Sequence, residues 1–121
     1  MSDTPALAPG TRIESLRIDR VLGQGAFGVT YLVTDTVLDT SFALKEYLPR
    51  GLAVRDENGG LQPVDGASRE RFAEGLAAFL AEGRVTAKLD HPNVARVVRC
   101  FEANGTAYLQ MPWYRGETLD G

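Results

Sequence analysis

The chain has 121 residues, of which 44% are apolar and 24% charged, and a formal net charge of −3. These values are typical of one globular domain, and they exclude a sequence-independent nucleic-acid binder, because the 13 Lys and Arg form no basic cluster against 16 Asp and Glu. The sequence has neither a charged start followed by an apolar run nor a stretch of about eighteen apolar residues that could span a bilayer. We therefore expect a cytoplasmic protein.

Residues 1–10, MSDTPALAPG, are expected to be a flexible leader before a single domain at 11–121. Alternating apolar positions then predict three antiparallel strands in succession, over RIDRVL (17–22), VTYLV (29–33) and FALKEYL (42–48). Asp35, Asp39 and Ser41 indicate a turn between the second and third strands. Residues 49–68, with two prolines and the hairpin-like NGG at 58–60, are predicted to be a surface excursion.

Residues 68–89 place apolar or small side chains at helical spacing, which predicts an amphipathic helix with Ser68 as its N-cap. Gly75 and Gly83 should each weaken this helix by up to about 1 kcal/mol relative to alanine. Two short strands follow around the turn Asn104-Gly105, so the predicted order is β-β-β-α-β-β.

The only cysteine and the only histidine are not expected to be functional. Cys100 has no second cysteine to pair with and lies in an apolar run, which indicates a buried structural thiol. His91 lies in DHPN, where Pro92 marks a turn, so a loop or capping role is expected. We expect no metal site in this chain.

GQGAFGVTYLV, residues 23–33, has three glycines in six positions and then continues directly as a strand. A dinucleotide-binding fingerprint needs a helix after its glycines, and a P-loop needs Lys and Ser or Thr where this chain has Val29-Thr30. A glycine-rich hairpin over a triphosphate fits instead, with Phe27 at its tip, and a plain flexible turn is the alternative. Side chains at the three glycines would hold the backbone N–H groups away from phosphate oxygens or forbid the turn.

Three further features accompany this loop: FALK ending at Lys45, Glu82 nine residues before His91 in ExxxxxxxxHPN, and YLQMPWYRGETL at 108–119. Over about residues 17–119 the chain resembles the N-terminal lobe of bacterial Hanks-type serine/threonine protein kinases, and it is most similar to a proteobacterial group with KEYLP after the lysine strand. The resemblance implies an α+β lobe, with a five-stranded antiparallel sheet and one main helix, that binds ATP with Mg²⁺.

The resemblance assigns Lys45 to the α- and β-phosphates and Glu82 to an ion pair with it. Glu70 and Glu74 are rivals for that role, and solvated side chains are the plain alternative. Met111 takes the gatekeeper place and Pro112 begins the hinge. The residues implied around the nucleotide are Leu22, Gly23, Gln24, Gly25, Ala26, Phe27, Gly28, Thr30, Ala43, Lys45, Met111, Pro112 and Tyr114.

Two departures from the family pattern are Thr30, where valine is usual, and the long separation of Lys45 from Glu82, which residues 49–68 fill. The HRD and DFG motifs do not occur, and Arg55-Asp56 imitates HRD only in part, so we assign it no role.

We therefore expect an ATP-binding lobe that is inactive alone, from a parent that transfers the γ-phosphate to protein Ser or Thr and holds Mg²⁺ through an absent C-lobe. The alternatives are a stand-alone N-lobe-like module in protein–protein regulation and a pseudokinase that keeps nucleotide binding. The expected partners are ATP and the parent's protein substrates, and the isolated lobe should self-associate through its bare underside.

Overall fold

The computed structural model of the chain describes residues 6–88 and 97–113. Six strands form one antiparallel sheet in the order β1-β2-β3-β4-β8-β7. Their bounds are β1 Arg12–Ile13, β2 Leu16–Gln24, β3 Gly28–Asp35, β4 Thr40–Tyr47, β7 Arg99–Ala103 and β8 Thr106–Pro112. One long helix, α1 (Arg69–Lys88), connects β4 to β7 through an insert that contains a two-stranded sheet of β5 (Ala53–Arg55) and β6 (Leu61–Pro63).

This architecture confirms the predicted five strands and single helix in the order β-β-β-α-β-β, and adds the two-residue strand β1 and the small β5–β6 hairpin. The predicted turns at Asp35–Ser41 and at Asn104-Gly105 also form. The Asp35 carboxylate accepts hydrogen bonds from the Val37 and Leu38 N–H groups at 2.9 and 3.1 Å, which closes the β3–β4 turn. Asn104 and Gly105 have φ values of 54° and 73°, the left-handed conformation that a two-residue hairpin turn requires.

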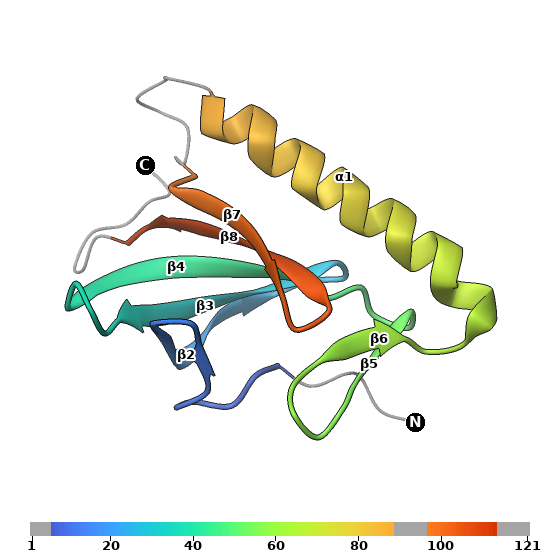
Figure 1. Cartoon of the computed structure of the whole chain (residues 1–121), viewed down its shortest axis with the longest axis horizontal. Coiled ribbons are helices and arrows are strands. Elements are labelled where there is room, and N and C mark those ends of the chain that lie inside the picture. Colours follow the sequence, from blue (N-terminus) through green and yellow to red (C-terminus); the bar gives the residue numbers. More distant parts are fainter. Residues whose placement is uncertain (1–5, 89–96, 114–121) are drawn as a thin grey trace.

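The two faces of the sheet are covered by different parts of the chain. Tyr47 on β4 packs against Phe72 and Phe79 of α1, with ring centroids 5.4 and 5.6 Å apart. Its neighbour Glu46 points to the opposite face and pairs with Arg55 of β5. We call these the helix face and the insert face. Figure 1 shows α1 running beside β7 and β8, with β5 and β6 on the other side of the sheet.

The insert at residues 49–68 is more than the surface excursion that its sequence predicted. Ala53 and Leu61 are 3% and 5% exposed and belong to the main hydrophobic core. The Leu61 N–H also donates to the Asn104 carbonyl at 2.6 Å, which attaches β6 to the β7–β8 turn. Prolines and glycines predicted its turns correctly, but they carry no information about the surface on which a loop packs.

The two glycines of α1 are contact sites, not simply weak points in the helix. A Cβ built at Gly75 would overlap the Tyr47 hydroxyl, and one at Gly83 would overlap the Leu109 side chain. Both glycines therefore let the helix backbone approach the sheet. Ser68, the predicted N-cap, directly precedes α1 and is the last residue of a short 3₁₀ helix at Gly66–Ser68. That 3₁₀ helix has its own N-cap, Asp65, whose carboxylate accepts the Ser68 N–H at 2.8 Å.

Candidate functional site

Several predicted site residues lie in two rows that cross adjacent strands on the helix face. In the first row, Gly23 pairs with Thr30, Thr30 with Lys45 and Lys45 with Leu109, so β2, β3, β4 and β8 contribute one residue each. In the next row, Ala43 of β4 lies between Leu32 and Met111. Directly opposed residues share a face, so the register places Thr30, Lys45, Ala43 and Met111 on the same side. Leu22 lies at an irregularity of β2 beside this row.

The glycine loop joins the end of β2 to the start of β3 through Gly25, Ala26 and Phe27. The Gly25 N–H donates to the Gly28 carbonyl at 2.8 Å, which closes the loop. At its tip, the carbonyls of Phe27 and Ala26 accept hydrogen bonds from the N–H groups of Leu48 and Arg50, both at 3.0 Å. The loop is thus attached to the chain where β4 leads into the insert. The Phe27 side chain is 74% exposed.

Glycine occupies the three loop positions for different structural reasons. None of them adopts a positive φ, so the backbone of the turn does not require glycine at these positions. A Cβ on Gly28 would lie 2.8 Å from the Glu46 carbonyl, which makes glycine necessary for the contact between β3 and β4. A Cβ on Gly23 or Gly25 would meet no atom within 4 Å. The space beside these two glycines is open, which fits a loop that a phosphate could approach.

Lys45 is the one cationic residue among the predicted site residues, and it lies beside this open space. Its side chain is exposed and runs toward the loop, with Cε 3.7 Å from the position that a Cβ on Gly28 would occupy. Ala43, two residues earlier on the same face, is 8% exposed. A charged group therefore stands next to the glycine loop, and a small side chain lies beneath the neighbouring part of the face.

Glu82 lies on α1 with an exposed side chain. The adjacent Gly83 packs against Leu109, which is paired with Lys45 across the sheet, so Glu82 lies on the turn of α1 that contacts the row containing the lysine. The ion pairs recorded between described residues are Arg17–Asp19, Arg55–Glu46 and Arg99–Glu14, and a Lys45–Glu82 pair is not among them. The ion pair stays a prediction. The rivals Glu70 and Glu74 lie at least two turns closer to the start of α1.

The predicted hinge is described only at its beginning. Met111 and Pro112 end β8, where they pair with Ala43 and Phe42 of β4 and are partly exposed. Tyr114 lies outside the described residues, as do His91 and Pro92 of the predicted turn.

Sequence reasoning missed a buried polar cluster directly behind this site. Glu46 is 0% exposed and accepts hydrogen bonds from the hydroxyls of Tyr31 and Tyr108, both at 2.6 Å. Arg55, dismissed at first as an imitation of a catalytic motif, donates to both oxygens of the same carboxylate at 2.9 and 3.3 Å. Burial, followed by the charge and hydrogen bond of Glu46, raises the pKa of both tyrosines. A signal existed in the sequence, since Glu46 occupies an apolar position in the alternation of its strand.

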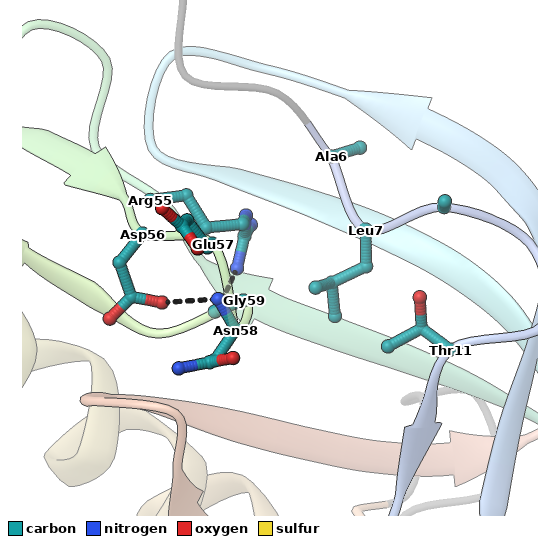
Figure 2. Close-up of a pocket in the computed structure, with 9 residues that line it drawn as sticks. Ala6, Leu7, Thr11, Arg55, Asp56, Glu57, Asn58 and Gly59 are labelled. Atoms are coloured by element: carbon teal, nitrogen blue, oxygen red, sulfur yellow. Dashed lines mark hydrogen bonds between the residues drawn. The ribbon is translucent and has the colours of Figure 1, made fainter.

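The remaining candidate features lie elsewhere. A cavity of about 260 Å³ lies on the insert face between residues 6–11 and the hairpin at 55–59, away from the glycine loop (Figure 2). Cys100 is half-buried, less than its sequence predicts, and burial raises the pKa of its thiol. Within the described residues, no three His, Cys, Asp or Glu side chains gather as a metal site would need, and no helix is long and apolar enough to cross a membrane.

Comparison with known proteins points to protein kinases. The solved structure of the PpkA-294 apo form matches 93% of this chain, with a TM-score of 0.87 and 34% sequence identity. The PknI kinase domain of Mycobacterium tuberculosis (the C20A_R136A double mutant) matches 90% of this chain, with a TM-score of 0.58 and 28% sequence identity. The serine/threonine-protein kinase PknD of Chlamydia pneumoniae is 30% identical over 110 residues, or 88% of this chain. PknJ of Mycobacterium tuberculosis is 30% identical over 91% of it.

The chain spans only part of each of these proteins: 40% of PpkA-294, 36% of the PknI structure, 10% of PknD and 16% of PknJ. No family model matches the sequence.

Proposed function

We propose that this chain, which has the fold of a protein-kinase N-lobe, is the ATP-binding lobe of a bacterial serine/threonine protein kinase of the group with KEYLP after the lysine strand. The homologues are serine/threonine-protein kinases, and their names carry the proposed specificity. The observation that supports nucleotide binding most is the placement of Lys45 beside an open glycine loop, on one face of four adjacent strands. Because ATP is the proposed ligand, the proposed location is the cytoplasm.

Each group in the proposed site has a physical role. Lys45 would place a positive charge against the α- and β-phosphates, where it offsets their mutual repulsion. The backbone N–H groups around Gly23 and Gly25 would donate to phosphate oxygens, because no side chain keeps the phosphates at a distance. Ala43 would leave room for the adenine ring, and Pro112 would offer its carbonyl but no N–H. Glu82 would hold Lys45 in its binding rotamer through an ion pair.

Phosphoryl transfer needs groups that this sequence does not contain. An aspartate must position the acceptor hydroxyl, and an asparagine and a DFG aspartate must hold Mg²⁺, yet neither HRD nor DFG occurs here. We propose that a C-lobe supplies them in the active enzyme, which would act on Ser or Thr of protein substrates. The 40% coverage of PpkA-294 supports this division. The 121-residue chain alone should bind ATP weakly and transfer no phosphate.

The same division supports self-association of the isolated lobe. Leu32 and Met111 on the nucleotide side of the helix face are partly exposed, and Phe27 at the loop tip is 74% exposed. We propose that these side chains belong to an apolar surface that a second copy would cover, since large contiguous apolar patches usually find a partner.

The proposal is tested by titrating the chain with ATP while amide chemical shifts are recorded. Shifts should concentrate at residues 23–30, at 43–45 and at Met111, with saturation only at high ATP concentration. Lys45→Met should weaken binding by about ten-fold or more, since one close charge pair with phosphate is lost. Arg17→Met is the matched control, because it removes one exposed arginine far along β2 from the loop. A titration in which ATP moves no resonance, or in which both variants bind alike, would contradict the proposal.

A further inference from the structure

Glu46 and Arg55 form a buried ion pair behind the candidate nucleotide site. The Glu46 side chain is 0% exposed and the Arg55 side chain 6% exposed, and the guanidinium reaches both carboxylate oxygens. A buried charge is costly unless it is paired and hydrogen-bonded. Here the carboxylate has one cation and two hydroxyl donors, Tyr31 and Tyr108. The pair can therefore persist in the interior only if these partners stay in place.

The cluster connects the insert to the three central strands of the sheet. Arg55 ends β5, whereas Tyr31, Glu46 and Tyr108 lie on β3, β4 and β8. Arg55 also donates to the Gly59 carbonyl at 2.8 Å, which fixes its guanidinium within its own hairpin (Figure 2). The same guanidinium thus binds both its own hairpin and the sheet.

Two short paths lead from this cluster to the nucleotide site. The first runs along β4, where Glu46 adjoins Lys45 and successive side chains point to opposite faces. Anchoring Glu46 on the insert face therefore fixes the backbone from which Lys45 extends on the helix face. The second path runs along the insert to its start, where Leu48, just before the insert, and Arg50, within it, hold the carbonyls at the tip of the glycine loop.

We propose that Arg55 is a positioning residue for the nucleotide site: it fixes Lys45 through Glu46, and it fixes the glycine-loop tip through the start of the insert. The inference rests on the proposed function, because it assigns a role in the site proposed there. This proposal assigns the insert a role in the site in addition to connecting β4 to α1. Arg55 touches no nucleotide and acts only through the residues that it holds.

The first test needs no nucleotide. Amide hydrogen exchange is compared in the wild-type chain, in Arg55→Met and in the control Arg17→Met, which breaks an exposed ion pair instead of a buried one. In Arg55→Met, protection at Leu48 and Arg50 should fall about ten-fold more than protection at Leu44 in the sheet centre, because the loop attachment opens locally. In Arg17→Met the amides should keep their relative protection.

The second test measures ATP affinity of the same variants well below their melting temperatures. Arg55→Met should weaken binding about ten-fold, since Lys45 and the loop are no longer held in place. Arg17→Met should bind as the wild type does. A uniform loss of protection in Arg55→Met, together with unchanged ATP affinity, would show that the ion pair only stabilises the fold, and would overturn the inference.

Two further comparisons keep the outcome decisive. If Arg55→Met does not fold, Arg55→Lys retains the charge but loses the two-point contact, and should show the same local pattern at smaller size. An Arg55→Lys chain with uniform loss of protection would likewise overturn the inference. Failure of the wild type to bind ATP would refute the proposed function instead, while the nucleotide-free exchange would still decide whether Arg55 holds the loop tip.

Discussion

Gly75→Ala in α1 separates what helix propensity predicts from what the packing of this helix predicts. On propensity alone, alanine inside a helix is more stable than glycine by about 1 kcal/mol. In the structure, a Cβ at this position would overlap the Tyr47 hydroxyl and lie 2.9 Å from Cζ of the same ring. The sign of the change in stability therefore depends on whether Tyr47 can move away.

Tyr47 is held from several sides. Its side chain packs between Phe72 and Phe79, its hydroxyl donates to the Phe72 carbonyl at 3.1 Å, and the residue is 4% exposed. Forcing a methyl group into a filled site costs about 1–3 kcal/mol, and losing the hydrogen bond adds about 1 kcal/mol. After the propensity gain is subtracted, we expect Gly75→Ala to lower the free energy of unfolding by about 1–3 kcal/mol, and the melting temperature by about 4 °C per kcal/mol.

The assay is urea and thermal unfolding followed by far-ultraviolet circular dichroism. Ala78→Gly is the matched control: Ala78 is exposed on the same helix, so this change should cost about 1 kcal/mol through propensity alone. In a Tyr47→Phe background, which lacks the hydroxyl, Gly75→Ala should cost less than in the wild type. A Gly75→Ala chain that melts about 4 °C higher than the wild type would refute the reasoning, because propensity would then outweigh packing.

Burial and Glu46 raise the pKa of Tyr31 and Tyr108 above the ordinary value of 10.0, so their neutral hydroxyls contribute stability that is complete below pH 10 and is lost as the pH rises further. Urea unfolding between pH 9 and 11 should show this fall, and Tyr108→Phe should reduce its slope by about 1.4 kcal/mol per pH unit. Gly28→Ala should destabilise the chain, because its Cβ would lie 2.8 Å from the Glu46 carbonyl. Gly25→Ala should leave stability unchanged and weaken ATP binding, since a Cβ there would meet no atom within 4 Å. Equal melting temperatures of the two variants would contradict this assignment. The purified chain should incorporate no labelled phosphate from ATP, and any incorporation that survives further purification would show that a transferase site is present after all. Sedimentation over a concentration series should show self-association, and a strict monomer at high concentration would refute that proposal.

The sequence by itself determined the order of the elements and the turns that separate them. Alternating apolar residues predicted β2, β3 and β4, and helical spacing predicted α1 to within one residue of each end. Asn104-Gly105 predicted the β7–β8 hairpin, since few residues adopt the positive φ that its turn needs. The kinase resemblance carried by the glycine loop and Lys45 predicts a nucleotide site, which stays a prediction. All of these signals are local in the chain, and local backbone preference and burial pattern are what a single sequence records.

Only the tertiary structure determined which residues from separate elements contact each other. It showed that Gly75 is a contact with Tyr47, although the same residue read in sequence is only a poor helix former. It also showed that Arg55 is a buried partner of Glu46, nine residues away along the chain, although a charged residue in a Gly- and Pro-rich insert normally indicates solvent. Both outcomes depend on the distance of closest approach between elements, which side chains from separate parts of the sequence set together, and no periodicity along one chain encodes that distance.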